Sequence, residues 1–195
     1  WLRPQDMVFS TSAGIRDESS GNGLVNAPDD ADFFGYRLDW LALDKNEEWR
    51  AKAMPSTVGT LEYIAFETRR LLAAMRPAET FVALDVTALV LPAAEPGGLD
   101  GAAGGRAPDH SSGQVFDLNV AGISAAEREC LRFVLDDLGW NGYLGFIDEP
   151  ESRGTVHIGC SPSSRDFFAQ VFGDMQAALR DRSNPPAVTP AAPTP

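Results

Sequence analysis

The pattern of apolar residues changes its period at Pro77, and this change constrains the fold more than any other feature of the chain. Before it, from Pro55 to Arg76, apolar side chains recur at the i, i+3, i+4 spacing of a helix with one core-facing stripe. After it, residues 80–91 form a run of β-branched and aliphatic residues with proline nearby on both sides. Such a run is typical of a buried strand. The two segments together predict a helix that leads directly into a strand.

The second half of the chain continues this alternation. Ser124 and Glu127 form a capping box at a helix start, and Gly139 is the kind of residue that ends a helix in the left-handed conformation. The elements predicted after residue 91 are a strand at 114–120, a helix at 124–138, strands at 143–149 and 155–160 joined as a hairpin by residues 150–154, and a helix from Ser163. This order predicts an α+β fold, in which about three helices flank a small antiparallel sheet.

Three parts of the chain differ in composition. Residues 1–50 are loop-rich and are expected to pack as an N-terminal extension on a domain that spans residues 51–183. Residues 184–195 are a Pro/Ala/Thr tail that cannot pack and is expected to be disordered. Residues 92–109 are dominated by Gly, Ala and Pro and predict a mobile surface loop. That loop lacks the GK[ST] ending of a phosphate-binding loop.

The charge balance limits the partners of the chain. Its 16 basic and 28 acidic residues give a net charge of -12, which would repel a phosphate backbone, so nucleic acid is not an expected partner. No run approaches the roughly 18 apolar residues of a membrane span, so no membrane span is expected in this chain. Cys130 and Cys160 are too few for a disulfide scaffold; two buried thiols are the expectation, and pairing between them stays open.

Two histidines and one aspartate suggest a metal site. Asp117 follows His110 in the motif H-S-S-G-Q-V-F-D, and His157 is the other histidine of the chain. Two neutral imidazoles and a carboxylate form a three-ligand zinc site with a fourth position for water, the pattern of catalytic zinc. Positions seven apart in an ideal strand point to opposite faces, so His110 and Asp117 can share an ion only if the backbone turns at residues 111–113. A buried aspartate also needs a cationic partner. Taken singly, each histidine is otherwise interpreted as an ordinary core or loop residue.

The predicted hairpin places a candidate base near His157. With a five-residue loop at 150–154, Glu149 becomes a diagonal neighbour of His157 on the same face of the sheet, at roughly 7 to 8 Å. A carboxylate there can accept a proton from metal-bound water and pass it to a leaving amine. Glu151, which lies in the loop, is the second candidate for this role.

Residues 80–160 resemble the metallopeptidase clan that includes the D-alanyl-D-alanine carboxypeptidases of family M15 and the hedgehog amino-terminal signalling domain. The family pattern is H-x-x-G-x-A-x-D, then a helix that ends in glycine, a strand with an acid, and a strand with the last histidine. The corresponding residues here are His110, Gly113, Val115 and Asp117, then the helix at 124–138 with Gly139-Trp140, then Glu149 or Glu151, and finally Thr155-Val156-His157. Residues 55–91 also resemble the helix and strand that precede this motif in bacterial M15-like domains.

The resemblance implies a zinc metallopeptidase. It would act on peptidoglycan stem peptides as a D-Ala-D-Ala carboxypeptidase or endopeptidase, with zinc on His110, Asp117 and His157 and with Glu149 or Glu151 as the base. It also implies an extracytoplasmic location, periplasmic or secreted, because the substrate lies there.

Two departures from the family pattern bear on turnover. Leu91 stands where the family has an arginine suited to a terminal carboxylate, and Thr155 stands where it has the first histidine of H-x-H. Arg106 would replace the arginine, or else the enzyme cuts internal bonds. The chief alternative function is a zinc-stabilised binding or signalling domain without turnover. A third interpretation is a structural domain without a metal.

Overall fold

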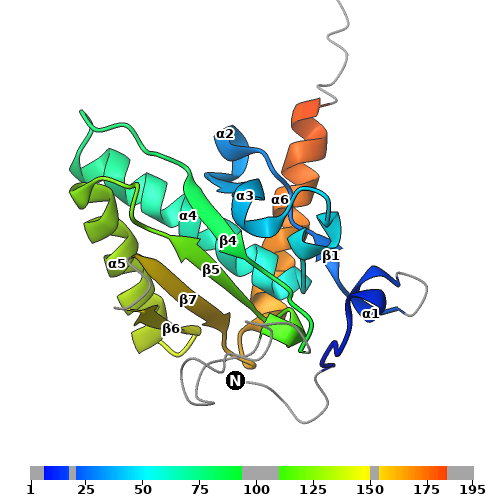
Figure 1. Cartoon of the computed structure of the whole chain (residues 1–195). Helices are drawn as coiled ribbons and strands as arrows, with labels where there is room; N and C mark the ends of the chain where they lie inside the picture. The colour runs from blue at the N-terminus through cyan, green and yellow to red at the C-terminus, as the bar shows by residue number, and fades with distance from the viewer. Residues whose placement is uncertain (1–6, 18–20, 94–109, 150–153, 184–195) are drawn as a thin grey trace, which may run out of the picture.

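At the centre of the protein lies a five-stranded sheet (Figure 1). The structure is a computed structural model and describes residues 7–17, 21–93, 110–149 and 154–183. The strands of the sheet lie in the order β2 (Tyr36–Leu38), β4 (Leu84–Ala88), β5 (Val115–Asn119), β7 (Thr155–Cys160) and β6 (Leu144–Glu149). A separate two-stranded sheet pairs β1 (Val25–Asn26) with β3 (Lys52–Ala53).

The central sheet is mixed. Strand β2 runs parallel to β4, and every other neighbouring pair is antiparallel. The predicted α+β class is confirmed, but the sheet is not purely antiparallel because residues before 51 supply β2 as an edge strand. The predicted hairpin is confirmed in its register, since Glu149 pairs with Thr155 and Ile147 with His157.

Helices cover one face of this sheet (Figure 1). Within the described residues there are six α-helices and two short 3-10 turns, and the three long helices are α4, α5 and α6. Helix α4 packs against both α5 and α6. The bounds are α1 (Ser12–Arg16), α2 (Ala31–Phe34), α3 (Trp40–Leu43), η2 (Glu48–Ala51), α4 (Pro55–Met75), η4 (His110–Ser112), α5 (Ala125–Trp140) and α6 (Arg165–Ser183).

Alternation along the strands gives the sheet two different faces. In β5, Phe116 and Leu118 are fully buried in the core with Leu61 and Ile64 of α4. Asp117, between them, points to the opposite face, and its side chain is 20% exposed. The helical face therefore forms the core, and the other face carries polar side chains.

Helix α4 occupies the predicted segment, with Pro55 at its first turn and Arg76 as its C-cap. The capping box of α5 is also present, because the Ser124 hydroxyl accepts from the Glu127 amide at 3.1 Å. The predicted end of α5 at Gly139 was wrong. The helix continues to Trp140, and the left-handed residue that follows it is Gly142, with φ 75°.

The predicted strand at 80–91 is shorter in the structure, where β4 spans only Leu84–Ala88. Its flanks find other partners: the Val82 amide donates to the Glu127 carboxylate of α5 at 3.3 Å, and the Leu91 amide donates to the His110 carbonyl at 3.3 Å. The period of apolar residues in a sequence cannot show whether a backbone amide bonds to a neighbouring strand or to another group.

Helices α4 and α6 approach each other closely at Gly59. A Cβ atom built on this residue would lie 1.9 Å from the carbonyl oxygen of Phe168 in α6. Only glycine permits this contact between the two backbones. Glu62, one turn further along α4, is fully buried beneath the sheet.

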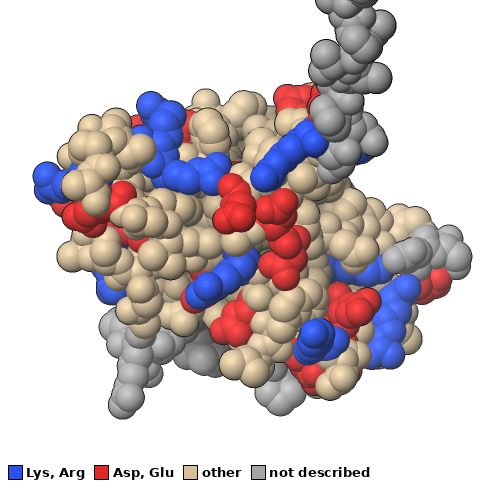
Figure 2. Space-filling view, turned by 90° about the horizontal axis from the view of Figure 1, so that it is seen from above, with Lys and Arg blue, Asp and Glu red and all other residues tan. Residues whose placement is uncertain are grey.

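The surface seen in Figure 2 carries acidic and basic side chains side by side, with no broad area of a single sign. None of the helices in the described ranges combines the length and apolarity of a membrane-spanning segment. Cys130 and Cys160 are both buried and free, so the expectation of two buried thiols is confirmed. The tail at 184–195 lies outside the described residues.

Candidate metal centre

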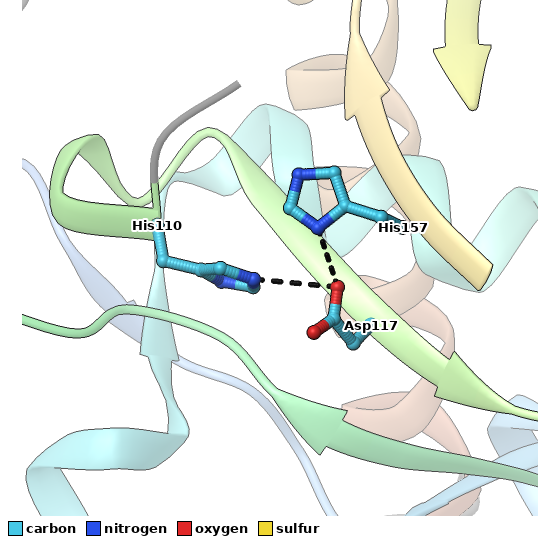
Figure 3. A group of neighbouring side chains, drawn as sticks. All are labelled: His110, Asp117 and His157. Atoms are coloured by element: carbon cyan, nitrogen blue, oxygen red, sulfur yellow. Dashed lines mark hydrogen bonds and ion pairs between the residues drawn. The ribbon is translucent and has the colours of Figure 1, made fainter. Parts of the chain in front are cut away.

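Three side chains from two separate segments of the sequence converge on the polar face of the sheet (Figure 3). Asp117 and His157 are directly paired across β5 and β7, and His157 Nδ1 lies 2.6 Å from Asp117 Oδ1. His110, at the start of η4, places its Nε2 atom 3.3 Å from the same oxygen. One potential ligand atom from each residue lies within 4.8 Å of the others. The predicted group of three is therefore assembled and could hold a metal ion.

The backbone turns where the spacing of His110 and Asp117 requires it. After η4, Gly113 adopts φ 66°, in the left-handed region that favours glycine. Its carbonyl accepts from the Met54 amide at 2.9 Å and from the Thr57 hydroxyl at 2.9 Å. The N-terminal end of α4 thus fixes the turn, and the turn carries His110 over to the face of Asp117.

A backbone carbonyl sets the orientation of His110. The Nδ1 atom of this imidazole is hydrogen-bonded to the Leu89 carbonyl oxygen, and because a carbonyl only accepts, Nδ1–H is the donor. Nε2 then faces the centre: when it carries a proton it can donate to Asp117, and in the neutral ring it presents its lone pair to a metal ion. Metal-binding histidines commonly use their second nitrogen in this way.

The centre is built around a negative charge. His110 and His157 are only 2% and 3% exposed. Burial by itself would raise the pKa of Asp117, but hydrogen bonds from His110 and His157 outweigh burial and hold that pKa well below its usual range. An ionised carboxylate only accepts hydrogen bonds, so a proton or a metal ion must lie between it and each imidazole.

The donor set fits a transition metal. Ligands bonded at about 2.0 to 2.1 Å to a tetrahedral ion lie about 3.3 Å apart, the spacing between His110 Nε2 and Asp117 Oδ1. The 2.6 Å between His157 Nδ1 and Asp117 Oδ1 is a hydrogen-bond distance, so a metal that replaced the proton would require these atoms to separate slightly. Two imidazoles favour zinc, copper, iron or nickel over magnesium or calcium.

Of the two predicted acids and the predicted arginine, the structure describes only Glu149. Glu149 is the last residue of β6, where its backbone pairs with Thr155, two residues before His157 in β7. Glu151 and Arg106 lie outside the described residues.

The two departures from the family pattern lie next to the centre. The Leu91 amide bonds to the carbonyl of His110, so Leu91 is adjacent to a candidate ligand. Thr155 precedes His157 by two residues in β7 and shares its face. The local chemistry beside the three ligands therefore differs from the pattern that the resemblance supplied.

Comparison with known protein families, curated proteins and solved structures found no match to this chain. Sequence reasoning missed the Leu89 carbonyl as an orienting group, because a backbone atom leaves no signature in residue type. It also missed Phe9, whose backbone accepts from Ala93 and donates to Ser111 beside His110. Phe9 ends the short apolar run Met7-Val8-Phe9, which does not indicate the partner of its backbone.

Proposed function

We propose that this protein is a zinc-dependent peptidase that acts on peptidoglycan stem peptides. The observation that carries the proposal is the group of His110, Asp117 and His157, in which a backbone carbonyl orients one imidazole. The peptide substrate, and with it an extracytoplasmic location, comes from the resemblance to M15 peptidases.

Zinc is the ion that the resemblance to M15 peptidases implies, and two nitrogens with one carboxylate oxygen suit it, since they leave a fourth tetrahedral position open. When bound at such a site, zinc lowers the pKa of a coordinated water to about 7 and polarises a carbonyl group. The Leu89 carbonyl keeps His110 in the tautomer that can bind the ion. Asp117 supplies a negative charge, since its low pKa keeps it ionised.

Glu149 is the proposed proton acceptor among the described residues. Diagonal neighbours on adjacent strands are about 7 to 8 Å apart at their α-carbons, which a glutamate side chain and one substrate atom can span. Glu149 would take a proton on its carboxylate and return it to the departing amine. Glu151 is the second candidate for this role.

The first test is metal content. Wild-type protein purified without chelators should contain one zinc per chain, and His157→Ala should contain none. Asp148→Asn, on the same strand as Glu149 but exposed, is the matched control and should keep its zinc. Wild-type protein without zinc would contradict the metal centre itself.

The second test is turnover. Muropeptides incubated with the zinc-loaded protein should lose D-alanine or cross-links, and chelation should stop the loss. Glu149→Gln should keep its zinc and lose at least about 100-fold in rate if Glu149 is the base. Full activity of this variant would exclude Glu149 and leave Glu151 to be tested.

The second candidate function is a zinc-stabilised binding domain without turnover. The position of Leu91 favours it, because an aliphatic residue adjoins His110 where the resembling family has an arginine. Unchanged muropeptides from fully metallated protein would favour this role over the peptidase.

A further inference from the structure

A row of polar residues crosses four of the five strands beside the candidate centre. Strand pairing places its members directly opposite one another, so their side chains share one face. The row consists of Thr155, Asn119, Asp85 and Arg37, from β7, β5, β4 and β2 in turn. It lies two residues along the strands from the row that contains Asp117 and His157.

This row belongs to the sheet face that the long helices leave uncovered. The side chains of Arg37 and Asp85 are 55% and 22% exposed, and Asn119 is partly exposed. By contrast, Tyr36 and Leu38, the neighbours of Arg37 in β2, are buried on the other face. A ligand that reaches the candidate metal centre can therefore continue along the row.

At the β2 end of the row, the surface is hollowed. A cavity of about 370 Å³ is lined by Arg37 and Asp85, by Asp39 with Trp40, and by Lys45. Trp40 supplies an apolar wall, and the two basic side chains supply positive charge. The cavity thus combines the features of a site for an anionic group on an amphipathic ligand.

Arg37 has hydrogen-bonding capacity to spare. Its Nε atom donates to the Asp85 carboxylate, which orients the guanidinium. Among the described residues, its two terminal nitrogens have no hydrogen-bond partner. These nitrogens form the fork that binds a carboxylate through two parallel hydrogen bonds. Asp39, the other acid of the cavity, is occupied with the Leu41 and Ala42 amides at the start of α3.

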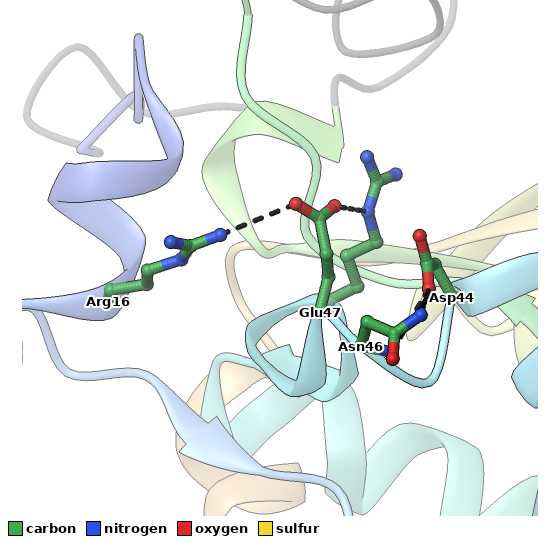
Figure 4. Close-up of polar contacts among 5 residues, drawn as sticks. Arg16, Asp44, Asn46 and Glu47 are labelled. Atoms are coloured by element: carbon green, nitrogen blue, oxygen red, sulfur yellow. Dashed lines mark hydrogen bonds and ion pairs between the residues drawn. The ribbon is translucent and has the colours of Figure 1, made fainter.

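Lys45 adds a second cation. It sits in the turn after α3, where Asp44 adopts φ 63° and its carboxylate accepts from the Asn46 amide at 3.0 Å (Figure 4). In the same close-up, Glu47 pairs with Arg16 at 3.4 Å and with a neighbouring arginine, so both of these arginines have an acidic partner. Lys45 makes no such ion pair with the described part of the chain. Its charge is available to a ligand in the cavity.

We propose that this polar row is the floor of a substrate groove, and that Arg37 together with Lys45 binds a carboxylate of the peptide substrate. The inference rests on the proposed peptidase function and adds a specificity site to it.

The sheet geometry predicts the register of the substrate. Arg37 lies two strands away from Asp117 and one two-residue step along, so their α-carbons are about 12 Å apart. An extended peptide covers that span with roughly three to four residues. The bond that is cut should therefore lie about three residues from the bound carboxylate, which makes the enzyme an endopeptidase.

The test measures peptide binding as well as cleavage. The probe is a dye-labelled stem pentapeptide, prepared with a free terminal carboxylate or with a terminal amide, and its binding to zinc-loaded protein is followed by fluorescence anisotropy. Wild-type protein should bind the acid about tenfold more tightly than the amide, the loss expected for a charge-assisted hydrogen bond at a half-exposed site. Arg37→Gln should lose most of this preference, and Lys45→Gln should lose a smaller part of it.

Arg70→Gln is the matched control. Arg70 is 62% exposed and pairs with Glu67 within α4, so its replacement removes a similar exposed ion pair away from the groove. The control should keep the wild-type preference, and all variants should keep one zinc per chain. An unchanged preference for the acid in Arg37→Gln would overturn the carboxylate site.

Cleavage separates this inference from the proposed function. Cleavage with no dependence on Arg37 or on the carboxylate would overturn the groove and leave the peptidase standing. Binding that depends on Arg37 without any cleavage would support the groove and contradict the peptidase. Neither binding nor cleavage would overturn both. Mass spectrometry of the products should place the cut about three residues from the carboxylate, and release of a single terminal residue would contradict the predicted register.

Discussion

Two carboxyl groups, Asp117 with 20% of its side chain exposed and Glu62 fully buried, lie on opposite sides of the central sheet and have opposite surroundings. Asp117 faces two imidazoles, and their hydrogen bonds hold its pKa well below the usual range although burial acts in the other direction. Glu62, within α4, has no hydrogen-bond partner for either carboxyl oxygen among the described residues. Burial raises its pKa from 4.5 to about 8, and the nearby amide of Gln176 offsets only part of that effect.

The comparison shows how one chemical group serves two purposes. Asp117 is kept charged and is therefore suited to attract a cation. Glu62 is kept neutral at pH 7 and behaves as a costly polar group within an apolar interface. A low exposed fraction alone thus does not identify a functional acid; the partners of the acid decide.

The largest effect is expected from Gly59→Ala, which would disturb the packing of α4 and α6 around Glu62. The new methyl group would collide with the Phe168 carbonyl oxygen and force α6 away from α4 near Glu62. We expect a loss of more than about 3 kcal/mol in the free energy of unfolding, measured by urea denaturation. Gly173→Ala on α6, where a Cβ meets no atom within 4 Å, is the control and should not destabilise. Equal stability of both variants would show that the helices do not need this contact.

Glu62→Gln should remove a pH dependence of stability. In the wild type the unfolded chain releases the Glu62 proton near pH 4.5 and the folded chain only near pH 8, so stability falls as pH rises between these values. Each unit of pKa difference corresponds to about 1.4 kcal/mol, so the loss should reach a few kcal/mol.

Urea unfolding at pH 5 and at pH 8.5 measures this loss. The glutamine variant should lose much less stability between the two pH values than the wild type. Glu129→Gln, which lies on the exposed side of α5, should retain the wild-type dependence. Identical pH profiles for Glu62→Gln and the wild type would refute the assignment.

Gly113→Ala tests the surroundings of Asp117, because Gly113 forms the turn that places His110 at the candidate metal centre. Alanine at φ 66° is strained, and its Cβ would lie 2.8 Å from a methyl group of Leu24. We expect a cost of about 1 to 3 kcal/mol and weaker zinc binding, measured by competition with a chelator. Gly122→Ala, at an open position, should change neither quantity. Unaltered zinc affinity in Gly113→Ala would mean that the turn does not position His110.

The smallest effect is expected from Glu127→Gln, an intermediate case. Glu127 is also buried, which raises its pKa, but its carboxylate accepts from the Val82 and Ser124 amides. Glutamine retains one acceptor oxygen, so the variant should lose only about 1 kcal/mol. Its pH dependence should lie between those of Glu62→Gln and the wild type. If Glu127→Gln changed the pH dependence of stability more than Glu62→Gln does, the proposed order of the two acids would be reversed.

The candidate ligands could be predicted from the sequence because few alternatives existed. With two histidines in the chain, the spacing between His110 and Asp117 demanded a turn, and Gly113 provides it. The hairpin register followed from loop length and alternation, so the pairing of Glu149 with Thr155 was also predictable. Its role as a base stays a prediction.

Other features depend on partners that are remote in the sequence. Strand β2 has only three residues, and its apolar pattern is too short to distinguish it from a loop until β4 lies beside it. The pairing of Arg37 with Asp85 joins residues 48 positions apart, so no local motif announces it. Glu62 was missed for a similar reason, because it occupies an ordinary position in an amphipathic helix and only the approach of α6 isolates it.

The contacts beside His110 also bear on how the protein can change over evolution. The Leu89 carbonyl and the Leu91 amide, which precede residues 94–109, are hydrogen-bonded to His110, which follows them. The backbone of Phe9 is hydrogen-bonded to both Ala93 and Ser111. The two ends of that segment are thus fastened together independently of what lies between them. Doubling the length of a flexible loop costs only about 0.6 kcal/mol once its ends are held. Insertions between residues 94 and 109 can therefore be accommodated while the candidate ligands keep their places.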